Sequence, residues 1–261
     1  MDIFPVNALR DNYVWMLTEG SFAWAVDPGE AEPVLAFLEK KSLPLQGILV
    51  THHHADHTAG IPALLKRYPG IPVYASDKTP VIAVTHRLAD GDVFSCGSVS
   101  FRGIAIPGHT LDHMAYLGDG ALFAGDTLFS AGCGKIFEGT VEMMYASLQK
   151  LMVLPPDTRL YCGHEYTLAN LAFAAMLEPW NAPLLALIKQ LLLKSRQGEH
   201  CTLPSTLQTE KEINPFLRCT VPAIIEVAEA HAKKKLATPG QVFGILRDWK
   251  NHFIVSPDKR I

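Results

Sequence analysis

The sequence lacks a strong charge of either sign and any long apolar run. Charged residues make up 19% of the 261 positions, fewer than the ~25% typical of soluble domains. The formal net charge of -3 provides no basic field for a phosphate backbone, so we expect no nucleic-acid partner. No stretch reaches the ~18 uninterrupted apolar residues of a membrane helix. The longest candidate, 184–193, is interrupted by Lys189 and Gln190, so we expect no membrane association.

Cysteine is scarce and shows no pairing pattern. The five cysteines include no C-x-x-C pair, and an odd number cannot all pair within one chain. We predict a cytoplasmic protein, because the cysteines are expected to be reduced thiols and residues 1–10 contain no basic segment followed by an apolar run. Neither an internal repeat with a period of roughly 20 to 50 residues nor a low-complexity segment is present.

Apolar residues are plentiful, at 48% of the chain, which is ample for a packed core. Up to about Tyr166, short apolar runs are separated by Gly, Pro and Asp, a pattern typical of strands joined by functional loops. We predict strands at 13–17, 22–26, 47–50, 73–75, 99–106, 121–124 and 159–162, and helices at 33–41, 61–68 and 141–151. Strands with intervening helices predict a layered α/β architecture.

The composition changes after Thr167, where Leu, Ala and Ile take helical spacing. Helices are expected at 168–177, 181–196, 221–235 and 238–250, the last entered through Thr238-Pro-Gly-Gln. Single cores tend to divide beyond roughly 250 residues. We therefore predict an α/β domain at residues 1–166 and a helical domain at residues 167–261.

A dense group of imidazoles follows the predicted strand at 47–50. Histidine is 11 of 261 residues, yet four lie between His52 and His57, on the order of one chance in ten thousand per window. A tag remnant, a solvated tract or core histidines explain this less well, because the group is internal and follows a central strand. His52 and His54 point to the same side of an extended segment and can chelate one ion. Asp56 and His57 come where the chain turns, which predicts a second ion.

Further donors are needed, because each ion takes about three or four protein ligands. His109, Asp126 and His164 each follow an apolar strand and a glycine, which lets the backbone bend sharply. Taken singly, His109 could cap a turn, Asp126 could be a turn residue and His164 could be a core histidine. Taken together with the cluster, the three supply the missing metal donors. His53 should point away from its neighbours. His113 is either a partner for a metal-bound imidazole or a buried packing residue.

These motifs resemble a known enzyme family over nearly the whole chain. Thr51-His-His-His-Ala-Asp-His matches the T-H-x-H-x-D-H motif of the metallo-β-lactamase superfamily, which by itself indicates only the fold. Within it, the chain resembles the glyoxalase II (hydroxyacylglutathione hydrolase) family in Asp11-Asn-Tyr-Val-Trp, Val26-Asp-Pro-Gly, Gly125-Asp-Thr-Leu-Phe, Gly132-Cys-Gly-Lys-Ile-Phe-Glu-Gly-Thr, Gly163-His-Glu-Tyr-Thr, Asn214-Pro-Phe-Leu-Arg and Arg247-Asp-Trp-Lys-Asn-His-Phe. The resemblance implies an αββα sandwich with metals at one edge, and makes the helical domain a substrate-binding one.

The resemblance also implies a two-metal thioester hydrolase. It assigns one ion to His52, His54 and His109 and the other to Asp56, His57 and His164, with Asp126 bridging. Asp56 and Asp126 are also expected to be catalytic. The ions would be divalent, zinc first, with iron or manganese as alternatives, and a bridging hydroxide would attack the thioester. The expected reaction cleaves S-D-lactoylglutathione to glutathione and D-lactate, a step of methylglyoxal detoxification.

Substrate binding is likewise assigned by resemblance, to Lys135, Tyr166, Arg247 and Lys250. The last two should hold a glutathione carboxylate, although without the resemblance they would be interpreted as a solvated helix face. Two positions depart from the family. Phe137 stands where some members carry a substrate-contacting Tyr, and Asp112 stands where Gly is usual.

Other functions remain open at this point. A persulfide dioxygenase of the same superfamily would use a single iron and consume oxygen. A non-enzymatic metal-binding protein is a further alternative, whereas a class B β-lactamase and a processing nuclease fit the donors and charge less well. We expect a monomer whose partner is a small glutathione thioester.

Overall fold

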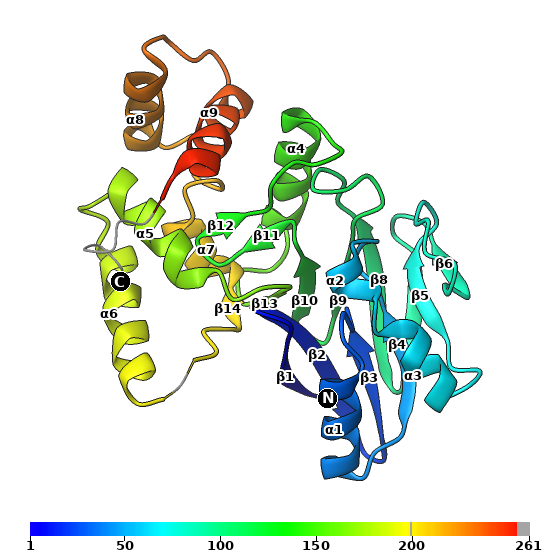
Figure 1. The fold of residues 1–261 in the computed structure, drawn as a ribbon. Helices are drawn as coiled ribbons and strands as arrows, with labels where there is room; N and C mark the ends of the chain where they lie inside the picture. The colour runs from blue at the N-terminus through cyan, green and yellow to red at the C-terminus, as the bar shows by residue number, and fades with distance from the viewer. Residues whose placement is uncertain (199, 255–261) are drawn as a thin grey trace.

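The computed structural model describes residues 1–198 and 200–254, and two six-stranded sheets form its centre (Figure 1). The first sheet has the order β1-β2-β3-β4-β5-β6 and comprises β1 (Asp2–Ala8), β2 (Asn12–Glu19), β3 (Phe22–Val26), β4 (Leu45–Leu49), β5 (Val73–Ser76) and β6 (His86–Leu88). The second has the order β14-β13-β10-β9-β8-β7 and comprises β7 (Val93–Cys96), β8 (Val99–Ala105), β9 (Met114–Gly118), β10 (Ala121–Gly125), β13 (Arg159–Cys162) and β14 (Ser205–Thr206). A small pair, β11 (Leu128–Phe129) and β12 (Gly132–Cys133), lies beside it.

Helices pack on both outer faces, which gives the expected αββα sandwich. Apolar residues of α1 (Glu32–Lys41) and α3 (Ile61–Arg67) form one cluster with the outer side of the first sheet, whereas α4 (Val141–Met152) packs on the second. Between the sheets lies an aromatic-rich cluster that includes Trp15, Phe101 and Tyr116. This layered arrangement confirms the predicted fold class.

The C-terminal residues form helices, as the spacing of apolar residues predicts. They are α5 (Thr167–Leu177), α6 (Ala182–Arg196), α7 (Leu207–Ile213), α8 (Pro222–Ala232) and α9 (Pro239–His252). Asn181 caps α6 by accepting from Leu184 N, and Thr238 caps α9 by accepting from Gln241 N. Phe243 of α9 shares an apolar cluster with Met144 of α4, so these helices pack directly on the α/β part.

Every predicted strand and helix is present within a few residues, but several elements were not predicted. Strand β1 is an edge strand that contains Pro5 and lies half exposed, so its sequence lacks a clear apolar alternation. The predicted helix at 221–235 is wrong at its end, because α8 stops at Ala232 and Lys233 adopts a left-handed φ of 54°. The backbone N–H of the left-handed Lys233 donates to Glu229 O and closes the last turn, which ends the helix there.

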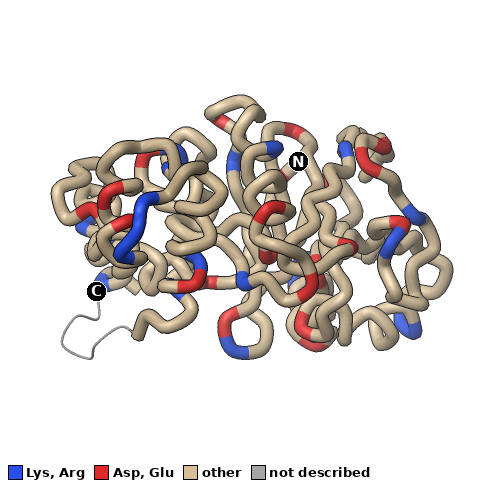
Figure 2. Tube along the Cα trace, turned by 90° about the horizontal axis from the view of Figure 1, so that it is seen from above, with Lys and Arg blue, Asp and Glu red and all other residues tan. Residues whose placement is uncertain are grey.

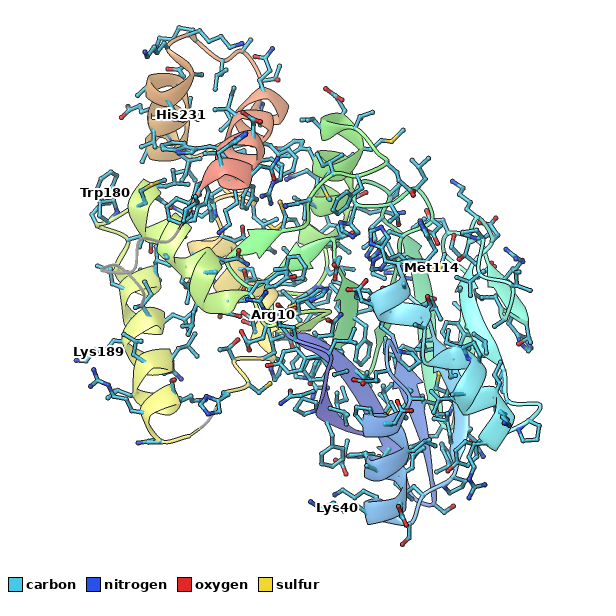
Figure 3. All side chains as sticks on the ribbon, in the orientation of Figure 1. Arg10, Lys40, Met114, Trp180, Lys189 and His231 are labelled. Atoms are coloured by element: carbon cyan, nitrogen blue, oxygen red, sulfur yellow. The ribbon has the colours of Figure 1, made fainter. Side chains whose placement is uncertain are left out.

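Side-chain positions show the extent of the two parts. In Figure 3, Trp180, Lys189 and His231 mark the C-terminal helices at the left, Lys40 marks α1 at the bottom, and Met114 at the start of β9 lies toward the right. Acidic and basic residues are interspersed along the trace in Figure 2, apart from the lysine run at 233–235. Within the described residues, no helix combines the length and apolar character needed to cross a membrane.

Candidate metal centre and adjoining cavity

The donors lie where four strands end at the same edge of the sandwich. Strand β4 leads into residues 51–57, β8 leads toward His109, β10 ends one residue before Asp126, and β13 ends two residues before His164. Strand β10 is parallel to β13, so Asp126 and His164 leave the second sheet side by side. The ends of β4, β10 and β13 that lead to the donors are buried, and they fix the edge from which the polar side chains project.

His52, His54 and His109 converge into what we call the first donor group. His54 Nδ1 lies 3.1 Å from His52 Nε2 and 3.1 Å from His109 Nε2. His52 and His109 are buried, while His54 is partly exposed. The three ring nitrogens thus face one small volume from two loops.

The second donor group consists of Asp56, His57 and His164. Asp56 Oδ2 lies 3.5 Å from His57 Nε2 and 3.4 Å from His164 Nε2. The short helix α2 (Ala55–Thr58) turns the chain directly after His54, which separates Asp56 and His57 from the preceding histidines. This is the change of direction expected from the sequence.

Asp126 lies between the two groups. Its Oδ2 is 3.7 Å from His109 Nε2 and 3.2 Å from His164 Nε2, and its Oδ1 is 3.5 Å from His57 Nε2. Among the described side chains, Asp126 Oδ1 and His57 Nε2 are buried without a hydrogen-bond partner. Buried polar atoms rarely lack partners, so the residues fit a cation bound in the space between them.

Two glycines allow this close approach. Gly125 has a φ of +46°, and a Cβ there would lie 2.4 Å from Thr51 Oγ1. At Gly163 a Cβ would lie 2.5 Å from Asp126 Oδ1 and 2.7 Å from the His57 ring. A side chain at either position would therefore displace the donors.

The outer nitrogen of four imidazoles is held by a fixed acceptor. His57 Nδ1 donates to Asp27 (3.1 Å), His164 Nδ1 to Asp11 (2.8 Å), and His109 Nδ1 to the Lys135 carbonyl (2.8 Å). Thr51 Oγ1 gives its hydrogen to Asp27, so His52 Nδ1 donates to that hydroxyl at 3.0 Å. In the neutral rings, Nε2 then carries no proton and faces the centre, as a metal ligand must.

The sequence prediction did not include Asp11 and Asp27 as site residues. Asp27 follows the last residue of β3, which is adjacent to β4, and Asp11 precedes the first residue of β2. Asp11 and Asp27 could have been identified from their positions next to strand ends at the edge that carries the donors.

Burial and neighbouring charge act in opposite directions on the imidazoles. Burial lowers the pKa of His52 and His109 and so favours their neutral form. For His57, burial is outweighed by Asp126 and Asp27, and its pKa is raised well above the usual value. For His164, hydrogen bonds to Asp126 and Asp56 overcome burial and raise the pKa to about 10. A cation entering the second donor group must therefore displace protons.

His53 and His113 lie outside both donor groups. His53 Nδ1 is 2.8 Å from Asp112 Oδ1, on the side away from its neighbours. His113 stacks on His52, with ring centroids 4.7 Å apart, and its Nε2 accepts from Asp126 N at 3.0 Å. Its hydrogen bond therefore goes to the backbone of a donor residue, while its contact with the His52 ring is one of stacking.

A cavity of about 410 Å³ opens beside the centre. Its lining includes His109 and Asp126 at one end and all four residues predicted to bind substrate, namely Lys135, Tyr166, Arg247 and Lys250. The Tyr166 ring stacks on His164 at 4.7 Å. Phe137 is 64% exposed and lies edge-on to His54 (5.5 Å) and His109 (5.2 Å).

Arg247 and Lys250 form a pair of cations on α9 without a carboxylate partner in the described part of the chain. Arg247 is buried, donates to the carbonyl of Cys133 at 2.6 Å, and keeps a buried Nε without a partner. Burial, and then Arg247, lower the pKa of Lys250 to about 8. The alternative of a solvated helix face is therefore wrong for Arg247.

Comparisons with known proteins agree with this geometry. The model of the metallo-β-lactamase superfamily matches residues 12–164, and the model described as hydroxyacylglutathione hydrolase C-terminus matches residues 165–253. A hydroxyacylglutathione hydrolase from Nitrosomonas eutropha is 49% identical over 255 residues, covering 97% of this chain and 99% of that protein. The chain therefore belongs to the hydroxyacylglutathione hydrolase family.

Solved structures share the fold at lower identity. The crystal structure of ETHE1 from Myxococcus xanthus has a TM-score of 0.67 and 23% identity, and the match covers 100% of this chain and 95% of that one. The crystal structure of TTHA1623 in a di-iron-bound form has a TM-score of 0.53 and 27% identity, covering 62% of this chain and 91% of that one.

Proposed function

We propose that the protein is a hydroxyacylglutathione hydrolase that cleaves the thioester of an S-(2-hydroxyacyl)glutathione such as S-D-lactoylglutathione. The products would be glutathione and a 2-hydroxy acid, D-lactate for that substrate, which places the reaction in methylglyoxal detoxification. The observation that carries the proposal is a cavity that adjoins the two donor groups through His109 and Asp126. Its lining also includes Arg247 and Lys250, which have no carboxylate partner among the described residues. The names of the full-length relatives support it.

The first donor group would hold one divalent ion and the second another, with Asp126 reaching both. When bound, such ions polarise a carbonyl and acidify a water near neutral pH. Zinc suits this mixture of imidazole and carboxylate, with iron and manganese as alternatives. A di-iron-bound form of a structural relative supports a two-ion centre.

The chain's own residues would orient and balance this centre. Asp126 and Asp56 are ionised, because contact with His57 and His164 outweighs burial and lowers both carboxyl pKa values. Their two negative charges offset part of the charge of two dications. Asp27 and Asp11 fix the rings of His57 and His164, so the donors need no reorientation during the reaction.

Substrate recognition would fall to the cavity lining. Glutathione carries carboxylates, and the Arg247 and Lys250 side chains supply charge-assisted donors for one of them. Lys135 and Tyr166 lie nearer the donors and would contact the part of the substrate next to the thioester. The leaving thiolate needs no strong acid, so no further proton donor is required. We propose accordingly that residues 1–166 supply the metal centre together with Lys135 and Tyr166, and that residues 167–261 form a helical substrate-binding domain that supplies Arg247 and Lys250.

The deciding experiment is release of free thiol from S-D-lactoylglutathione by protein of measured metal content. We expect cleavage by protein with two ions per chain and loss of cleavage after chelation. Oxygen uptake with a glutathione persulfide by protein holding a single iron would favour the persulfide dioxygenase instead. Two bound ions without any turnover would favour a metal-binding protein without this activity. We further propose a cytoplasmic monomer, for which the five free cysteines are in keeping.

A further inference from the structure

Three charged or titratable side chains meet beside the first donor group without belonging to it. They are His53, Asp112 and Glu138, and they come from three separate loops. His53 Nδ1 donates to Asp112 Oδ1 at 2.8 Å, and His53 Nε2 lies 3.3 Å from Glu138 Oε1. Glu138 Oε2 also accepts from Leu111 N at 2.9 Å. Asp112 is buried, and the other two side chains are partly exposed.

The same three loops carry the first donor group and part of the cavity lining. His53 lies between His52 and His54 in the chain, and Asp112 lies three residues after His109. Glu138 follows Lys135, whose carbonyl accepts from the His109 ring. The contacts made by His53 therefore join the two segments from which the first donor group is built.

Backbone hydrogen bonds reinforce one side of this junction. The amides of Phe137 and Glu138 both donate to the His109 carbonyl, at 3.1 and 3.3 Å, and Gly139 N donates to Gly108 O at 3.2 Å. The segments at His53 and Asp112 share one backbone bond at their strand side, from Met114 N to Thr51 O at 2.8 Å. Nearer the donor rings, the contact of His53 with Asp112 adds a side-chain link between them.

We propose that His53, Asp112 and Glu138 form a positioning clasp that keeps His54 and His109 at the separation needed to retain the ion of the first donor group. This inference rests on the proposed function, because it assumes that the group binds an ion. The second donor group lies outside the clasp, since His164 is held by Asp11 and His57 by Asp27. Loss of the clasp should therefore affect one ion of the two.

The contacts favour a clasp over a third metal site. The two carboxylates approach different nitrogens of the His53 ring, so one ion could not replace both contacts. Tetrahedral coordination at ~2.0–2.2 Å would also hold two ligand atoms about 3.4 Å apart. The 2.8 Å between His53 Nδ1 and Asp112 Oδ1 is the length of a direct hydrogen bond.

Asp112 gives the sharpest test, because its Oδ2 is buried without a hydrogen-bond partner among the described residues. Removing a carboxylate with an unsatisfied buried oxygen relieves a desolvation cost, so Asp112→Ala should not lower the melting temperature of the metal-free protein strongly. A positioning role predicts weaker ion retention without a matching loss of stability. A purely structural role predicts that both change together.

The experiment compares Asp112→Ala, Glu138→Ala and Glu138→Gln with wild type, each loaded with zinc and challenged with a chromophoric chelator. Glu138→Gln keeps an acceptor for Leu111 N and should be the mildest. Lys235→Gln, which removes a remote exposed ion pair with Glu229, is the control for surface charge. Asp11→Asn is the reciprocal control, because Asp11 contacts the second donor group. In cadmium-loaded protein, nuclear magnetic resonance of the histidine rings identifies which ion is lost.

We expect Asp112→Ala and Glu138→Ala to lose the ion of His52, His54 and His109 roughly tenfold faster than wild type, the lower end of the range for partners that orient metal ligands. The other ion should be retained, and Asp11→Asn should show the opposite preference. Retention of both ions as in Lys235→Gln, or equal loss of both, would overturn the clasp. Three ions in wild type and two in Asp112→Ala would replace it with a third metal site. Failure of wild type to bind two ions contradicts the proposed function itself, so the two failures are distinguishable.

Discussion

The metal centre and the cation pair on α9 are built in different ways. Each donor histidine apart from His54 has its outer nitrogen held by a protein acceptor. Five of the seven donors project from loops at strand ends, and Asp56 and His57 project from the short helix α2. Arg247 and Lys250 project from one helix and are held by backbone carbonyls, and among the described residues Arg247 Nε has no hydrogen-bond partner. The difference separates the two tasks: the rigid strand edge would set the chemical step, and the helix would set substrate binding.

The largest effect is expected at Asp126, whose carboxylate lies within 3.7 Å of donor nitrogens of both groups. Asp126→Ala removes a ligand from each proposed ion and leaves His57 and His164 with Asp56 as their remaining shared carboxylate. Turnover should fall by more than the roughly 10- to 100-fold that follows loss of an outer partner. Metal content by elemental analysis and thiol release measure this, with the exposed Asp157→Ala as control. Near-normal turnover in Asp126→Ala would contradict the assignment of the chemical step to the strand edge, which is what distinguishes it from the cation pair on α9.

The cation pair should affect binding more than turnover. Arg247→Ala combined with Lys250→Ala should raise KM far more than it lowers kcat, because both groups would contact the ground and transition states alike. A loss of roughly 1.5–3 kcal/mol per charged hydrogen bond corresponds to more than tenfold in KM. Steady-state kinetics with S-D-lactoylglutathione, against Lys189→Ala on α6, provides the test. A loss mainly in kcat would assign these residues to the chemistry.

The smallest effect follows from the depressed pKa of Lys250. With that pKa at about 8, the side chain is a cation below pH 8 and loses its charge above it. KM for the anionic substrate should therefore rise several-fold between pH 7 and pH 9, since one charged contact is lost. Lys250→Arg should flatten this rise, because a guanidinium stays charged with a pKa above about 12. If KM rises with pH in Lys250→Arg as it does in wild type, the pH dependence of KM does not come from Lys250.

The sequence predicted the metal centre and the cation pair on unequal grounds. His52, His54 and Asp56 were readable because strand geometry and an abrupt turn dictate where neighbouring side chains point. The approach of His109, Asp126 and His164 depends on which strands are adjacent, and the sequence indicated it only through their shared position after strand ends. Arg247 was assigned by resemblance alone, since no local pattern shows that a charged helical residue becomes buried against Cys133.

The fold could be predicted from the sequence only to a similar extent. The predicted strands and helices rest on apolar runs and on entry signals such as Thr238. The structure confirms the layered architecture that they indicated. Edge strand β1 pairs locally with β2, but its mixed burial leaves no clear apolar alternation in the sequence. The roles of Asp11 and Asp27 depend on contacts between segments far apart in the sequence. Asn12 of β2, for example, forms a bridge with His164, 152 residues away in the sequence. Such contacts leave no periodic signal in either segment.

Stepwise addition of zinc to metal-free protein tests the account most directly, with ion binding followed by calorimetry and thiol release measured at each step. The account predicts saturation at two ions per chain, thioester cleavage that requires both, and proton release on filling the second donor group, where carboxylates raise the pKa of His57 and His164. Saturation at a single ion, or cleavage by the metal-free protein, would contradict it.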